Sequence, residues 1–255
     1  MSRAPAPAPA PAISARMVRF AGWSACLSGG LSIISGIFFV LFYALEVPRM
    51  STPDAPQTFG TLNDIATVFQ FLCLLPVTLA LHRLAPLDLR GLSLLGMVVG
   101  IVGLVGVVVV QALLVAGVLS FAVNLPLVMT AFGLFGVWML LANRLARASG
   151  ALAPRLAWLG QATGIAFILM SALTLLAVFM SWRDLSAVAR LGDAALQSPV
   201  LIGIALIVGI PLLLAFFIAV PLWDIWLGRR LLAMAGGAAE LRGSGRQPAH
   251  AGVSL

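Results

Sequence analysis

The amino-acid sequence predicts an all-α, polytopic membrane protein: a bundle of six transmembrane helices with the N- and C-termini in the cytoplasm. Of the 255 residues, 62% are hydrophobic and only 9% are charged. Soluble domains are usually about half apolar and about one quarter charged, so this composition excludes a water-soluble globular fold. It also excludes disorder over most of the chain, which requires low hydrophobicity and high charge.

Apolar segments of membrane-spanning length, about 20 residues each, define the six predicted helices. They lie at about residues 18–46, 61–84, 91–119, 124–145, 155–180 and 199–232. The first segment is too long for a signal-peptide core, so we expect it to remain as a helix of a membrane domain that covers residues 16–235. The Ala-Pro repeat in residues 1–15 and the Gly-, Ser- and Ala-rich residues 236–255 are expected to be disordered tails.

The arginines predict the orientation of the bundle. All 15 basic residues are Arg, and with a cytoplasmic N-terminus all but Arg49, Arg183 and Arg190 fall on the cytoplasmic side, as the positive-inside rule requires. Trp138 and Trp223 are then expected at the cytoplasmic membrane interface. Because the charges lie at helix ends, membrane lipids are the predicted partners and nucleic acid is not. The Lys-free composition is typical of a GC-rich bacterial genome, which favours a bacterial inner membrane.

Polar side chains recur every three or four residues along the predicted helix 61–84 and therefore share one face. They are Asn63, Thr67, Gln70, Thr78 and His82. Lipid cannot satisfy such groups, so we expect this face, and Gln70 in particular, to point into the bundle. Gln111 and Asn124 lie at a similar depth in neighbouring helices. The candidate polar pocket therefore consists of Asn63, Thr67, Gln70, Gln111 and Asn124, with hydrogen bonding between packed helices as the alternative interpretation.

Small residues on predicted helix 18–46, such as Ser28, Ser32 and Gly29, indicate close packing between helices. The same holds for the glycine pairs Gly96/Gly100 and Gly160/Gly164, spaced four residues apart.

Two acidic residues within the predicted helices have structural interpretations. Asp64 follows Thr61 at capping-box spacing, which predicts that its carboxylate stabilises a helix N-terminus. Asp224 is expected to pair with a nearby arginine: Arg229, Arg230, Arg83 or Arg144.

No pattern in the sequence indicates catalysis, a metal or a cofactor. No acidic or basic residue falls in the central layer of any predicted helix, and His82 is the one histidine near the membrane. Cys26 and Cys73 lie in apolar segments without metal-binding spacing and are expected to be free thiols. These observations favour a protein that is not an enzyme.

Three short segments carry a resemblance to a known family. They are Asn143-Arg-Leu-Ala-Arg147, Ala153-Pro-Arg-Leu-Ala-Trp-Leu-Gly160 and Ile225-Trp-Leu-Gly-Arg229. In this order they resemble a bacterial family of small six-helix membrane proteins known as a domain of unknown function. The resemblance implies a similar six-helix fold, and it implies no activity and no catalytic residue.

Two functions follow from the sequence. The first is a non-enzymatic membrane subunit that packs with a second copy of itself or with a partner membrane protein. The alternative is a transporter or receptor for a small solute or a lipid-like ligand that uses the polar face of helix 61–84. A central cavity lined by Asn63, Gln70 and Gln111 would favour the alternative.

Overall fold

The computed structural model describes residues 14–49, 57–181 and 215–243, and every regular element in these residues is a helix. The long helices are α1 (Ala15–Leu41), α2 (Thr58–Leu84), α3 (Arg90–Val115), α4 (Phe121–Ala148), α5 (Pro154–Ser181) and α9 (Val220–Gly243). Short turns η1 (Phe42–Glu46) and η2 (Val47–Arg49) continue α1, whereas η3 (Leu87–Leu89) precedes α3 and η5 (Ala215–Ala219) precedes α9. Residues 1–13 of the predicted tail 1–15, residues 199–214 of the predicted helix 199–232 and residues 244–255 of the predicted tail 236–255 lie outside the described residues.

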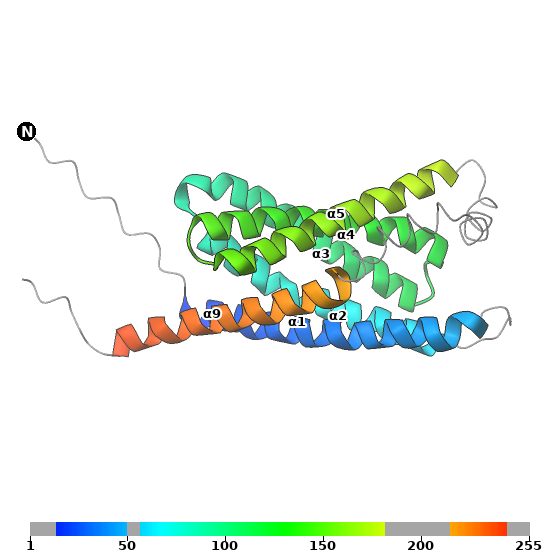
Figure 1. Cartoon of the computed structure of the whole chain (residues 1–255), viewed down its shortest axis with the longest axis horizontal. Helices are drawn as coiled ribbons and strands as arrows, with labels where there is room; N and C mark the ends of the chain where they lie inside the picture. Colours follow the sequence, from blue (N-terminus) through cyan, green and yellow to red (C-terminus); the bar gives the residue numbers. More distant parts are fainter. Residues whose placement is uncertain (1–13, 50–56, 182–214, 244–255) are drawn as a thin grey trace, which may run out of the picture.

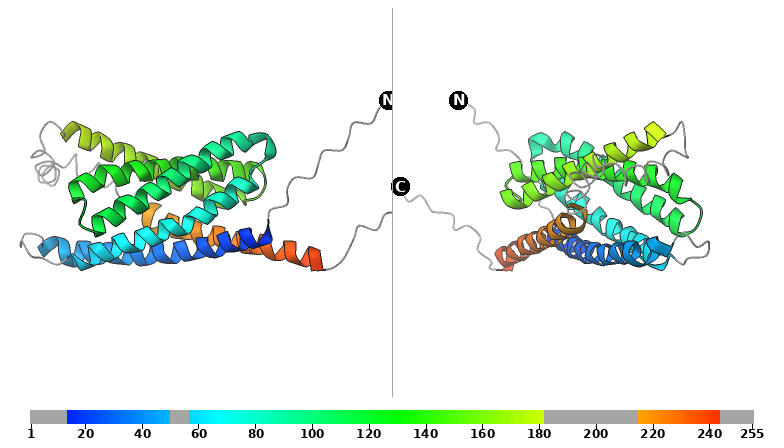
Figure 2. Two further views of the ribbon diagram at one scale, coloured as in Figure 1. Left: turned by 180° about the vertical axis from the view of Figure 1, so that it is seen from behind. Right: turned by 45° about the vertical axis from the view of Figure 1, so that its right-hand side comes forward.

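The helices form an up-and-down bundle in which each of α1 to α5 packs against the next along the chain (Figure 1). Helix α9 returns along α1 and makes a smaller contact with α5. Helices α1 and α9 lie on one side of the bundle, α3, α4 and α5 lie on the other, and α2 joins the two sides (Figures 1 and 2).

The two ends of the bundle differ in charge. One end of the bundle holds the starts of α1, α3 and α5 and the ends of α2, α4 and α9 (Figure 1). We call it the arginine end, because it carries exposed arginines on all of these helices, among them Arg16, Arg83, Arg90, Arg147 and Arg155. We call the other the far end, where α1 is followed by the two turns that finish at Arg49.

Five segments of the described chain are long and apolar enough to cross a membrane: Ala15–Arg49, Thr58–Leu84, Leu87–Val115, Val123–Ala148 and Pro154–Leu176. Their outward faces carry many exposed large apolar side chains, such as Val98, Val102 and Val109 on α3. The protein is therefore a multi-pass membrane protein. Helix α9, which carries Asp224 and two arginines, is not among these five segments.

The predicted packing of small residues is confirmed at the contact between α1 and α9. Ser28, Ser32 and Gly29 of α1 are buried. A Cβ atom at Gly228 would lie 2.6 Å from the backbone oxygen of Gly22 and 2.5 Å from the sulfur of Cys26. The two backbones therefore approach each other more closely than a side chain at this position would allow.

The glycine pairs also face neighbouring helices. A Cβ atom at Gly100 would meet the side chain of Trp138 at 2.5 Å. Likewise, a Cβ atom at Gly164 would lie 2.7 Å from the backbone oxygen of Gly136. Gly96 is looser, with its nearest neighbour, Leu141, at 3.6 Å, and Gly160 fits directly against the side chain of Asn143.

Two expectations about the arginine end are corrected. Helix α9 continues to Gly243, past the predicted helix end at residue 232 and into the predicted tail 236–255, and Ala235 extends its buried face beyond residue 232. Trp138 and Trp223 do not point outward, as tryptophans that contact lipid headgroups would. Both are fully buried and form an edge-to-face pair with ring centroids 6.2 Å apart.

Candidate functional site: a cavity near the far end of the bundle

The polar face of α2 points into the bundle, as its spacing predicts. Gln70 is 1% exposed, and Thr67 and Thr78 are also buried. The opposite face carries exposed apolar residues such as Phe69 and Leu79, which suits contact with lipid.

Part of this polar face forms a hydrogen-bonded cluster with α1 and α3. Ser35 of α1 donates to the side-chain oxygen of Asn63 (2.7 Å), and its hydroxyl also lies 3.2 Å from that of Thr67. The amide nitrogens of Asn63 and Gln111 both donate to Oδ1 of Asp64, at 3.3 and 3.0 Å. Gln111, which the sequence places at the depth of this pocket, joins the cluster through Asp64, a residue outside the candidate set.

A cavity of about 410 Å³ adjoins this cluster and has an otherwise mainly apolar and aromatic wall. Its polar lining residues include four of the five candidate residues: Asn63, Thr67, Gln111 and Asn124, together with Asp64. Its apolar lining includes Phe39, Tyr43, Met129, Phe132, Met170, Phe216 and Phe217. Thus α1, α2, α3, α4, α5 and the turn before α9 all contribute to the wall.

Gln70, the fifth candidate residue, is buried outside the cavity. It lies nearly two turns beyond Asp64 toward the arginine end, where Phe71 and Leu74 fill the core around α2. The prediction that Gln70 belongs to the same pocket is therefore wrong, because Gln70 lies closer to the arginine end than the cavity does. The predicted inward orientation of Gln70 is correct.

A second hollow, of about 540 Å³, adjoins the cavity and shares six lining residues with it: Phe39, Tyr43, Asn63, Asp64, Leu114 and Phe121. Its other lining residues include two exposed ones, Gln57 just before α2 and Thr61 in the first turn of α2. The two hollows together run from the interior of the bundle to the far end.

Two side-chain oxygens in the cavity wall have no hydrogen-bond partner. They are Oε1 of Gln111 and Oδ1 of Asn124, on residues that are 7% and 3% exposed. Buried polar atoms are normally satisfied, so each unpartnered atom requires an explanation. Both hydrogen bonds to Asp64 reach Oδ1, and no described residue donates to Oδ2. The cavity therefore presents several acceptors that lack donors.

The predicted capping role of Asp64 is wrong, and Glu46 takes that role instead. Helix α2 begins at Thr58, three residues before the predicted start, so Asp64 lies well inside the helix. The carboxylate of Glu46 accepts hydrogen bonds from the backbone N–H groups of Phe59 (2.9 Å) and Gly60 (3.2 Å). It thereby satisfies two of the donors that a helix N-terminus leaves free. Glu46 precedes the helix by a whole loop, so no local spacing predicted this contact.

The predicted ion pair of Asp224 is also corrected. Asp224 is fully buried against α1, where Ser28 donates to its Oδ2 at 2.8 Å, and its Oδ1 has no partner among the described residues. Leu227 and Leu231, three and seven residues further on, share this buried face. Arg229 lies five residues after Asp224. At 100° per residue this is a rotation of about 500° around the helix axis, so Arg229 is exposed on the other side of α9.

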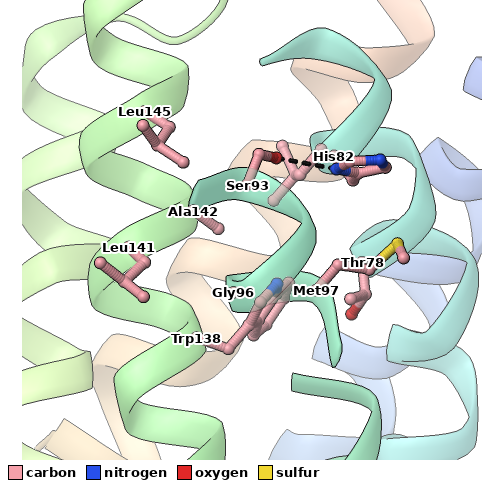
Figure 3. A pocket seen from close by; sticks show the side chains of 10 residues that line it. Thr78, His82, Ser93, Gly96, Met97, Trp138, Leu141, Ala142 and Leu145 are labelled. Carbon is pink, nitrogen blue, oxygen red and sulfur yellow. Dashed lines mark hydrogen bonds between the residues drawn. The ribbon is translucent and has the colours of Figure 1, made fainter. Parts of the chain in front are cut away.

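A third, much smaller space lies near the arginine end and is shown in Figure 3. It measures about 10 Å³ and is lined by Thr78, His82, Ser93, Trp138 and neighbouring apolar residues. His82 Nδ1 and the hydroxyl of Ser93 lie 2.9 Å apart and join α2 to α3 (Figure 3). A space of this size holds about one water molecule, so it is too small to bind a ligand.

One further polar contact, which the sequence analysis missed, joins α4 to α9. Asn143 is fully buried, its amide nitrogen donates to the backbone oxygen of Met139 (2.8 Å), and its oxygen accepts a bond from Trp223 Nε1 (3.0 Å). This bond fixes the rotation of α9, which in turn places Asp224 against α1.

Cys26 and Cys73 are free, in agreement with the sequence prediction. Within the described ranges, no three His, Cys, Asp or Glu side chains come together as a metal site would require.

Comparisons with protein-family models, with curated proteins and with solved structures return no match for this chain.

Proposed function

We propose that this protein binds a small, largely apolar molecule in the cavity near the far end of the bundle, as a receptor or transporter of the bacterial inner membrane. The observation that carries the proposal is the cavity itself. Its volume of about 410 Å³ lies within the range of about 300–1,000 Å³ that is usual for small-molecule sites. Such sites combine a mainly apolar wall with a few polar groups, and this cavity has that composition.

The unpartnered oxygens of Gln111 and Asn124 support the same function. Buried polar atoms are normally hydrogen-bonded; Oγ of Ser32 and Oε1 of Gln70 also lack a partner in the described chain, but these two residues lie outside the cavity wall. Gln111 lines the cavity and bonds to Asp64 through its nitrogen, but its oxygen has no partner among the described residues. A bound molecule that carries a donor would satisfy it.

The packing and partner-binding function that the sequence favoured accounts for the other half of the molecule. The tight contacts of α1 with α9 and of α3 with α4 explain the small residues of those helices. They leave the cavity near the far end without a role. We therefore propose ligand binding as the function of this protein. Membrane lipids are the proposed partners that surround it.

We further propose that α9 and the residues before it form a sixth membrane span and that both termini are cytoplasmic. The arginine end supports this orientation, because it collects exposed arginines from α1 to α5 and from α9. In this orientation the far end, and with it the ligand cavity, faces the outside of the cell.

Binding of a neutral probe tests the proposed function. The full chain is placed in phosphatidylcholine nanodiscs, and binding of naphthalen-1-ylmethanol is measured by equilibrium dialysis against empty nanodiscs. We expect saturable binding of one molecule per chain. The variant Val128→Phe adds bulk to the cavity wall and should abolish binding. Val137→Phe makes the same change on α4 at a position outside that wall and should preserve it. Equal binding by both variants, or no saturable binding at all, would contradict the proposal.

A further inference from the structure

We propose that the ligand of this cavity is a cation, an ammonium group attached to an apolar body, and that Asp64 binds the ammonium together with the amide oxygens of Gln111 and Asn124. This inference rests on the proposed function, since it names the chemical class of the molecule that the cavity takes.

The donors and acceptors of the polar cluster are unequally used. The amide nitrogens of Asn63 and Gln111 both donate to Asp64, and the hydroxyl of Ser35 donates to Asn63. Oε1 of Gln111 and Oδ2 of Asp64 are left, and both are acceptors, while the amide of Asn124 makes no hydrogen bond to a described residue and can turn its oxygen toward a ligand that brings donors. A ligand that satisfies this wall must therefore bring hydrogen-bond donors.

The direction of the two amides follows from the carboxylate. An ionised carboxylate accepts hydrogen bonds and donates none, so the nitrogens of Asn63 and Gln111 must turn toward it. The oxygen of Gln111 then necessarily points away from Asp64. Thus the outward orientation of the Gln111 oxygen is a consequence of Asp64 and not of an arbitrary choice of amide orientation.

Charge selects among the possible donors. Asp64 is the single charged residue among the described lining residues, and no described Arg or His lines the cavity. Asp64 is half-buried, and a carboxylate that is partly removed from water is stabilised by a counter-charge and by hydrogen bonds. Two neutral amide donors on one oxygen do not supply a counter-charge. An ammonium group supplies both the donors and the charge, whereas an alcohol supplies one donor, and an anionic ligand would add repulsion.

The remainder of the wall fits an organic cation better than a bare metal ion. Phe39, Tyr43, Phe121, Phe216 and Phe217 line the cavity together with methionines. Aromatic rings attract cations through their negative faces, and an apolar body of drug size fills a volume of this kind. A small inorganic cation would need several oxygen ligands around it and would leave most of the apolar wall empty.

Three probes with the same naphthalene body test the inference: naphthalen-1-ylmethylamine, naphthalen-1-ylmethanol and 1-naphthoic acid. Each is measured at neutral pH by equilibrium dialysis against the full chain in uncharged phosphatidylcholine nanodiscs. We expect the amine to bind at least about tenfold more tightly than the alcohol, because its hydrogen bond to Asp64 is charge-assisted. We expect the acid to bind most weakly. Asp64→Asn should reduce the affinity for the amine to that for the alcohol. Gln70→Leu, buried on the same face but outside the cavity, should change neither affinity.

The outcomes separate the inference from the function on which it rests. Equal binding of amine and alcohol to the unaltered chain, or tighter binding of the acid, would overturn the inference and leave the cavity as a ligand site. Failure of all three probes to bind would overturn the proposed function as well. Because the comparison of probes uses the unaltered chain, it decides the question even if Asp64→Asn does not fold. A folded Asp64→Asn protein that retains its preference for the amine would also overturn the inference.

Discussion

Two adjacent glycines in α1 provide a sensitive test of how closely α9 packs against it. A Cβ atom at Gly29 would lie 2.6 Å from Cγ1 of Ile225 and 3.0 Å from the backbone oxygen of Pro221. A Cβ atom at Gly30 would have nothing within 4 Å. The variants Gly29→Ala and Gly30→Ala therefore differ in contact with α9 but not in chemistry or in secondary structure.

The expected effect can be estimated from these contacts. Replacing a helical glycine by alanine gains up to about 1 kcal/mol in helix propensity, and this gain is common to both variants, so it cancels in their difference. Overpacking at a close contact lowers stability by about 1–3 kcal/mol. Only Gly29→Ala incurs this loss, since the backbone oxygen of Pro221 cannot move away as a flexible side chain can.

The assay is equilibrium unfolding of the full chain in mixed micelles with increasing sodium dodecyl sulfate, followed by tryptophan fluorescence. We expect Gly29→Ala to be less stable than Gly30→Ala by about 1–3 kcal/mol. Equal stability of the two variants would refute the close packing of α9 on α1, and with it the buried environment of Asp224.

Four further predictions use the same unfolding assay or a simple reporter. Glu46→Ala should lower the stability by about 1 kcal/mol, because the N–H groups of Phe59 and Gly60 lose their acceptor; an unchanged midpoint would speak against this cap. Asn143→Leu should lower it by about 1–3 kcal/mol, because Trp223 Nε1 is left buried without an acceptor, and a neutral effect would argue against that bond. Asp224→Asn should preserve the stability, since it keeps an acceptor for Ser28 at a site where no described residue supplies a counter-charge; a marked loss would reveal a cationic partner. Reporters fused after Arg90 or Arg147 should read as cytoplasmic and one within residues 50–58 as external, and the opposite pattern would reverse the orientation.

The sequence predicted well what depends on a single helix. Apolar length located α1 to α5 to within a few residues, because a membrane span requires about 20 apolar residues. Spacing of three and four residues identified the inward face of α2, including Gln70, because lipid offers amides no hydrogen bonds. The packing role of small residues on α1 followed from the same reasoning.

What the sequence could not predict depends on how helices rotate and slide against one another. Asn124 and Asn63 lie on different helices, and their meeting at one cavity depends on the relative depth of α2 and α4. The rotation of α9 buries Asp224 and turns Arg229 outward, whereas proximity in sequence suggested that they would pair. Glu46 reaches the start of α2 across a loop. Each of these contacts is tertiary, and no local pattern encodes it.

The aromatic wall of the cavity was missed for a related reason. Phe39 on α1 and Phe217 before α9 read as ordinary lipid-facing residues, since apolar side chains occupy every face of such helices. Only the assembled bundle shows that their rings lie 4.8 Å apart, centroid to centroid, beside the polar cluster. In a membrane protein the polar residues are therefore the informative part of a sequence, and the apolar part of a site becomes visible only in three dimensions.

The most direct test of the central claim is to locate a bound cation in the bundle. Crystals of the full chain grown with 4-bromonaphthalen-1-ylmethylamine would reveal the ligand through the anomalous scattering of bromine. We predict a bromine peak inside the cavity, among Phe39, Met129 and Phe216, with the amine within hydrogen-bond distance of Asp64. Bromine peaks confined to the lipid-facing surface, with side chains filling the cavity, would contradict the account.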